Sequence, residues 1–245
     1  MALTHRSSGS ASGDGDDPPR SPARSASIAA VVITACFCVH ATNGLIVERL
    51  FLGFHSYTDY ADVDKLGRAL GSAPWLASGV AHLVTGVAVV VLGVNLAQVI
   101  APRRARLAEY LRYATGVAAV GFTMLGVADV QGSQTVKLLA DQNPELRRTA
   151  YLALSIVVPV ANGVAITAFG WMMLIVARYA QGGLTGLPRW YMVLSYVAGA
   201  SGLLLGLAYV PVYLLLFLAW CWCTAVLFRH GGPVSLSARL AIQEP

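Results

Sequence analysis

Long apolar runs recur along most of this chain, and they constrain its fold more than any other feature. A helix that crosses the hydrocarbon core of a bilayer needs about 20 consecutive, mostly apolar residues. Six segments meet that condition, namely residues 28–48, 73–100, 112–130, 150–177, 190–207 and 210–228. The sequence therefore predicts an all-α fold, a polytopic transmembrane helix bundle of about six spans.

The composition favours a membrane protein over the other broad classes. Hydrophobic residues make up 56% of the chain and charged residues only 12%, whereas charged residues make up about 25% of an ordinary soluble domain. The net charge of +5 is carried mostly by segments between the apolar runs, and no basic stripe is interleaved with aromatic residues. These features argue against a soluble enzyme, a disordered chain and a nucleic acid partner.

The two ends of the chain differ in composition from the rest. Residues 1–27 are rich in Ser, Gly, Pro, Asp and Arg and show no apolar periodicity, which predicts a disordered cytoplasmic tail. Residues 28–229 would form the six-helix transmembrane domain, and residues 230–245 a short second tail in the cytoplasm. The sequence around Cys36 has the form of a lipoprotein cleavage site, but the apolar residues continue past it, which favours an uncleaved first helix.

The boundary between the last two apolar runs leaves two topologies open. Residues 208–211 form the junction of these runs, and Pro211 is the helix breaker available for a tight turn. Two spans would return the C-terminus to the side of the N-terminus. One kinked helix over 190–228 would leave five spans and put the C-terminus on the other side.

The distribution of lysine and arginine predicts the orientation. The two tails, residues 101–112 and residues 178–189 hold eleven of the seventeen basic residues, and the opposite connections hold six. Because basic residues accumulate on the cytoplasmic side, both termini are expected in the cytoplasm. High Ala, Val, Gly and Arg usage is typical of an actinobacterial source, so we expect the bacterial inner (plasma) membrane.

Two connections on the outer side are long. Residues 49–60 mix aromatic side chains with little net charge, which is typical of a segment at the membrane–water interface. A lid over an outward-facing cavity is the alternative for the connection 49–72. The connection 131–148 is similar in size and is expected to form a short helix that ends near Asn143 and Pro144.

Polar side chains inside the apolar runs are candidate ligand-binding residues, because polar groups in hydrocarbon are expensive. His40 lies twelve residues into the first run and His82 nine residues into the second, at depths of roughly 18 Å and 14 Å from opposite faces. Asn162 lies twelve residues into the fourth run, at roughly 18 Å from the outside. All three are expected near the midplane of a core about 30 Å thick.

Neighbouring residues extend these positions into polar stripes. Asn43 follows His40 on one helix face, and Ser78 and Thr85 flank His82 on another. Two stripes at one depth are expected to face each other or a shared cavity. Asp129, at the outer end of the third run, and Glu48 would lie near the outer mouth of that cavity.

Three interpretations of these polar residues stay open. In the first, they form structural hydrogen bonds between helices. In the second, a small ligand or transported molecule binds in a midplane cavity, with the ligand-binding residues His40, Asn43, His82, Asp129 and Asn162. In the third, a redox protein holds a b-type haem between His40 and His82 as axial ligands. No other cofactor and no metal is expected.

Small residues predict close helix packing, since they let helices approach in lipid. One stripe consists of Ser195, Gly199, Gly202 and Gly206, and another of Gly79, Gly86 and Gly93. Both stripes indicate packing seams, either within the bundle or between protomers of a homo-oligomer.

Motifs of common catalytic and metal sites are absent. The chain has no Walker A pattern, dinucleotide-binding glycine pattern, nucleophile elbow or His-Glu-x-x-His signature. The pairs Cys36/Cys38 and Cys221/Cys223 point to different sides of their helices, so neither pair can bind one metal. The sequence favours a non-catalytic membrane protein, either a structural or partner-binding component or a ligand binder. Its expected partners are the lipid bilayer and either a second copy or another membrane protein.

Two helix entries carry a resemblance to known proteins. The stretch from Leu66 through Trp75 leads into the second apolar run, and Leu187-Pro188-Arg189-Trp190 leads into the glycine-rich fifth run. From about residue 70 to 228 the chain resembles a group of small integral membrane proteins of actinobacteria and archaea that form a domain of unknown function. The resemblance implies a helical membrane protein and carries over no functional residue.

Overall fold

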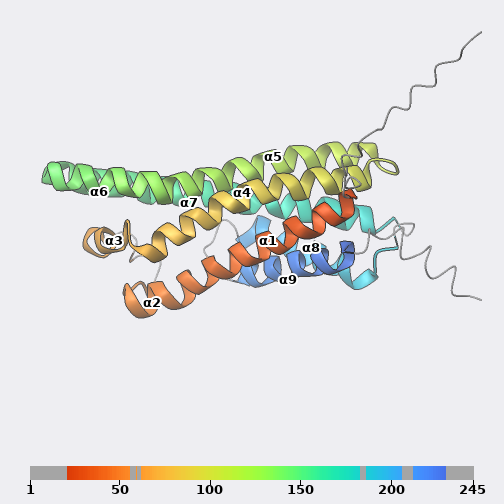
Figure 1. Cartoon of the computed structure of the whole chain (residues 1–245), viewed down its shortest axis with the longest axis horizontal. Coiled ribbons are helices and arrows are strands. Elements are labelled where there is room, and N and C mark those ends of the chain that lie inside the picture. Colours follow the sequence, from red (N-terminus) through yellow and green to blue (C-terminus); the bar gives the residue numbers. More distant parts are fainter. Residues whose placement is uncertain (1–20, 56–58, 60–61, 183–185, 206–211, 230–245) are drawn as a thin grey trace, which may run out of the picture.

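The structure is a computed structural model that describes residues 21–55, 59, 62–182, 186–205 and 212–229. Within these residues it contains helices and no strands, which confirms the predicted all-α class. The long helices run roughly along one axis and form an elongated bundle (Figure 1). The predicted tail 230–245 and residues 1–20 of the predicted N-terminal tail lie outside the described residues.

Two of the helical segments are π-helices, which contain one extra residue per turn and are labelled η. In chain order the segments are α1 (Pro22–Thr42), η1 (Asn43–Val47), α2 (Glu48–Phe51), α3 (Val63–Ala69), α4 (Ala73–Ile100), α5 (Ala105–Val127), η3 (Ala128–Gly132), α6 (Ser133–Gln142), α7 (Pro144–Ala180), α8 (Arg189–Leu205) and α9 (Val212–Phe228).

Four helices are long and apolar enough to cross a membrane, judged by length and composition. They cover Pro22–Thr42, Ala73–Ile100, Ala105–Leu139 and Arg148–Ala180. The second of these coincides with the predicted run 73–100, and the other three differ from their predicted bounds at one or both ends. The helices in the last two predicted runs, α8 and α9, have 17 residues each and are not among these four.

The first helix begins six residues earlier than predicted, so residues 22–27 are helical and the predicted disordered tail is too long. Ser21 caps the helix by accepting a hydrogen bond from the Arg24 backbone N–H, and Pro22 occupies the first turn. Ser27 Oγ then donates to the Ala225 carbonyl oxygen of α9 over 2.7 Å. The cap and this tertiary contact stabilise a helical conformation of residues 22–27, which their polar composition alone did not predict.

The connection 131–148 is helical and its helix ends near Asn143, as predicted, but this helix is not a separate short one. It is α6, which continues the long helix Ala105–Leu139 and ends at Gln142, and α7 begins two residues later at Pro144. α6 packs against α7, and this pair extends past α3 at one end of the bundle (Figure 1). In the connection 49–72, Leu66 and Leu70 are buried in a small cluster with Tyr151 and Leu154 of α7.

The last described segment forms two antiparallel helices, and not one kinked helix. Tyr191 at the start of α8 shares a 2.7 Å hydrogen bond with Thr224 near the end of α9. One turn later in α8 and one turn earlier in α9, Trp220 Nε1 donates to Ser195 Oγ over 2.8 Å. Contacts in this order require opposite chain directions.

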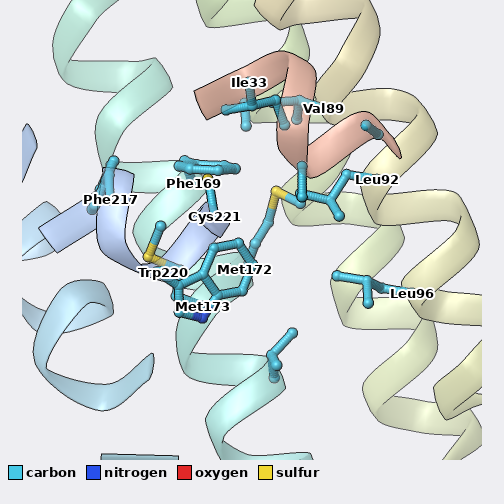
Figure 2. Close-up of a cluster of buried hydrophobic side chains, with 14 of the residues drawn as sticks. Ile33, Val89, Leu92, Leu96, Phe169, Met172, Met173, Phe217, Trp220 and Cys221 are labelled. Atoms are coloured by element: carbon cyan, nitrogen blue, oxygen red, sulfur yellow. The ribbon is translucent and has the colours of Figure 1, made fainter. Parts of the chain in front are cut away.

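The main hydrophobic core lies between α1, α4, α5, α7 and α9, and Figure 2 shows part of it around Phe169, Phe217 and Trp220. The ring centroid of Phe37 on α1 lies 5.9 Å from that of Phe169 and 6.3 Å from that of Phe217. Because His40 follows Phe37 by one helical turn, the apolar core gives way to polar side chains at that level.

Both predicted glycine seams pack inside the bundle. A Cβ atom added at Gly93 would lie 1.9 Å from Thr115 Oγ1 of α5, and one added at Gly199 would lie 2.8 Å from the Gly170 carbonyl oxygen of α7. These contacts join α4 to α5 and α7 to α8. Gly206 lies outside the described residues.

Candidate functional site

A histidine and an aspartate form a buried pair in the bundle. His82 Nδ1 of α4 lies 2.9 Å from Asp129 Oδ2 of η3. His82 is 7% exposed and Asp129 is 5% exposed. A buried carboxylate is strongly destabilising without a partner, so the imidazole of His82 satisfies Asp129. The sequence placed Asp129 at the outer mouth of a cavity; the structure places it beside His82.

A close crossing of two glycines brings this pair together. A Cβ atom added at Gly126 of α5 would lie 2.7 Å from the Gly79 carbonyl oxygen of α4. Each glycine precedes one member of the pair by three residues, which is nearly one helical turn. Only residues without a side chain let the two backbones approach this closely, so Gly79 and Gly126 set the distance between His82 and Asp129.

His40 of α1 lies directly against this pair. The ring centroids of His40 and His82 are 4.7 Å apart, with 53° between the ring planes. The Nδ1 atom of His40 is buried and has no hydrogen-bond partner among the residues that the structure describes. Buried polar groups are nearly always paired, so this nitrogen is available to a ligand atom.

Asn43 closes the cluster on the side of α2 and α3. Its side-chain Nδ2 donates to Ser78 Oγ and to the Pro74 carbonyl oxygen of α4, each over 2.8 Å. Asn43 is also the first residue of η1, and Asp129 lies in η3. Single π-helical turns occur often at functional sites because they redirect side chains. Two of them border this cluster.

The other candidate residues do not join the cluster. Asn162 is half-buried on α7, and no hydrogen bond links it to the histidines within the described part of the chain. Thr85 donates to the Ala81 carbonyl oxygen of its own helix. Glu48 begins α2, eight residues after His40, which places it roughly 12 Å further along the helix axis.

Two further polar atoms near the cluster were not identified from the sequence. Ser72 Oγ and Trp75 Nε1 are buried and, like His40 Nδ1, lack a hydrogen-bond partner among the described residues. They lie at the start of α4, one to two turns from Ser78. No sequence signal indicated unpartnered atoms at these two positions.

Haem does not fit between His40 and His82 as the structure places them. An imidazole nitrogen lies about 2 Å from a metal that it binds, so rings on opposite sides of one iron have centres roughly 6 Å apart. The observed centroid distance of 4.7 Å is too short for a porphyrin between the rings. Within the described residues, no group of three or more His, Cys, Asp or Glu side chains could hold a metal ion.

Comparisons of the chain with protein-family models, with curated proteins and with solved structures found no match. The resemblance to membrane proteins of unknown function therefore stays a prediction.

Proposed function

We propose that this chain is a six-span protein of the bacterial inner membrane that binds a small ligand at the cluster of His40, His82, Asp129 and Asn43. It binds without catalysing a reaction. Both termini lie in the cytoplasm. This proposal combines two observations in the described part of the chain: helices apolar enough to cross a membrane, and a group of ionisable side chains in contact between them.

An even number of spans is supported by a contact between the start of the first helix and the end of the last one. Ser27 near the start of α1 is bonded to Ala225 near the end of α9, so both lie at the same end. α8 and α9 are antiparallel and have 17 residues each, which corresponds to roughly 25 Å per helix. That length is at the lower limit for a crossing.

The depth of the cluster favours access from the outer side. His40 lies eighteen residues after Pro22, and His82 lies eighteen residues before Ile100, which is roughly 27 Å in both cases. In a core about 30 Å thick, this level lies in the half of the bundle on the side of α2 and α3. The two histidines are therefore closer to the membrane surface on that side than the predicted midplane position.

The observation that carries ligand binding is the unpartnered Nδ1 of His40 beside a histidine whose own Nδ1 is bonded to Asp129. A cluster with a purely structural role would pair its buried polar atoms, because each unpaired one is destabilising. Asn43, His82 and Asp129 all have partners. The Nδ1 atom of His40 has no partner among the described residues, so a function other than stability best explains it.

The topology predicts opposite results for two reporter fusions. Green fluorescent protein fused after Pro245 is expected to fluoresce, because it stays in the cytoplasm. The same reporter inserted at Asn143, between α6 and α7, is expected to be exported and dark. Alkaline phosphatase at the same two points serves as the inverse control. Phosphatase activity after Pro245 would contradict six spans.

Replacing His40 by leucine separates binding from stability. His40→Leu is expected to leave the free energy of unfolding unchanged or to raise it by up to about 1 kcal/mol, because an unpaired buried nitrogen is removed. We expect the same variant to lose the small molecules that wild-type protein retains through purification in mild detergent, as measured by mass spectrometry of denatured extracts. Val39→Leu, on the exposed side of the same helix, is the matched control. A destabilised His40→Leu protein with unchanged bound molecules would show that His40 is structural.

A further inference from the structure

The cluster around His40 contains one acid and two imidazoles from three different elements. His40 comes from α1, His82 from α4 and Asp129 from η3. With no proton added, the cluster carries one negative charge. One proton distributed over the three groups makes it neutral, and a second proton gives it one positive charge.

The other titratable groups near His40 do not change this balance. Tyr213 of α9 lies next to Phe217, on the next turn toward the level of His40, and a phenol is neutral at ordinary pH. Cys36 lies one turn below His40 on α1 and contacts Thr85 of α4. Glu48 is roughly 12 Å further along the helix axis, half-buried at the outer end. No second acid contacts His40 among the described residues that pack here.

A net charge inside a helix bundle is costly, so the neutral state with one proton is the resting state. A second proton on His40 becomes stable when a negative charge arrives with it. The protonated imidazole would then present its Nδ1–H, which has no acceptor among the described residues, to an oxygen of the ligand. An ion pair with a charged hydrogen bond is stronger than a neutral one.

On this basis, and resting on the proposed function, we propose that the cluster binds a small monocarboxylate together with one proton, which His40 receives. The proton comes from the outer aqueous phase and forms the second N–H bond of the His40 imidazole, and no bond within the ligand changes. The bound state is electroneutral: the ligand carboxylate balances the second proton of the cluster. Asn43 of η1 and Ser78 of α4 line the side from which the ligand enters, and the hydrogen bond between them holds η1 against α4.

Isothermal titration calorimetry of the full-length protein in mild detergent tests the proton. The probes are formate, lactate and benzoate, with neutral lactamide as the uncharged counterpart of lactate. Titrations in buffers of different ionisation enthalpy are expected to show uptake of one proton per carboxylate bound. Because binding is linked to one proton, the apparent affinity is expected to fall by up to about tenfold per pH unit between about pH 6 and pH 8.

Two histidine variants make the assignment specific. His40→Gln keeps hydrogen-bonding groups but cannot take the proton, and we expect it to lose proton uptake and to weaken carboxylate binding at least tenfold. His55→Gln removes an exposed histidine outside the cluster and is expected to behave as wild type.

A carboxylate that binds without proton uptake would overturn the proposal. So would no binding of formate, lactate or benzoate at tens of millimolar. Equal binding of lactamide would overturn it while leaving the proposed function intact, whereas failure of the proposed function itself appears as no retained small molecule in the purified protein.

Discussion

Replacement of His82 by leucine is expected to destabilise the folded protein by about 3–5 kcal/mol at neutral pH, because it leaves a buried carboxylate without its partner. His82 Nδ1 lies 2.9 Å from Asp129 Oδ2, and both side chains are almost fully buried. Asp129→Leu leaves only a neutral imidazole unpaired, so its cost is expected to be smaller, about 1–3 kcal/mol. The measurement is the free energy of unfolding in mixed micelles titrated with sodium dodecyl sulfate.

The double variant decides whether the two residues act as a pair. With both groups replaced by leucine, no polar group is left stranded, and the loss of stability is expected to be smaller than that of His82→Leu alone. His55→Leu, on the exposed connection, controls for the loss of a histidine as such. If the two single costs simply add in the double variant, the buried pair contributes no coupling and the site geometry is wrong.

The equal depth of the two histidines could be predicted because it follows from counting residues along regular helices. His40 and His82 were expected at similar depth, and the structure places their rings in contact. The partner of His82 could not be predicted in this way. Asp129 lies in η3, and the extra residue of a π-helical turn shifts the direction of every side chain after it. A 3.6-residue periodicity does not reveal such a turn.

Some helix ends could not be predicted either, because they depend on contacts between residues far apart in the sequence. The sequence of residues 190–228 was compatible with one kinked helix and with two separate helices, because Pro211 fits both. The hydrogen bond from Trp220 to Ser195 joins residues 25 positions apart, and only a folded chain reveals it. Residues 22–27 looked like part of a tail for a related reason: Ser27 is buried against α9, and that contact has no local signal. The signal available for the candidate site was Gly79, one turn before His82 in a predicted packing seam.

The close crossing at Gly79 and Gly126 is expected to affect both the stability of the protein and the distance between His82 and Asp129. Gly126→Ala is expected to lower the free energy of unfolding by about 1–3 kcal/mol, because an added methyl group in a tightly packed seam forces the helices apart. Its Cβ atom would lie 2.7 Å from the Gly79 carbonyl oxygen and 2.5 Å from Leu83 Cγ. A side chain can rotate away, but the backbone carbonyl cannot, so α4 and α5 must separate. The separation would lengthen the contact between His82 and Asp129 one turn further on.

Gly116 of the same helix provides the matched control, since a Cβ atom there meets nothing within 4 Å. Gly116→Ala is expected to be neutral or to stabilise the protein by up to about 1 kcal/mol, because alanine is the better helix former. The two alanine variants therefore share their propensity gain and differ only in what the methyl group meets. Unfolding titrations of both variants, each also combined with His82→Leu, complete the test. We expect Gly126→Ala to lower the free energy of unfolding by less when His82 is already leucine, because the contact between His82 and Asp129 is then absent and cannot be strained. Equal stability of Gly126→Ala and Gly116→Ala would mean that α4 and α5 do not cross at Gly79.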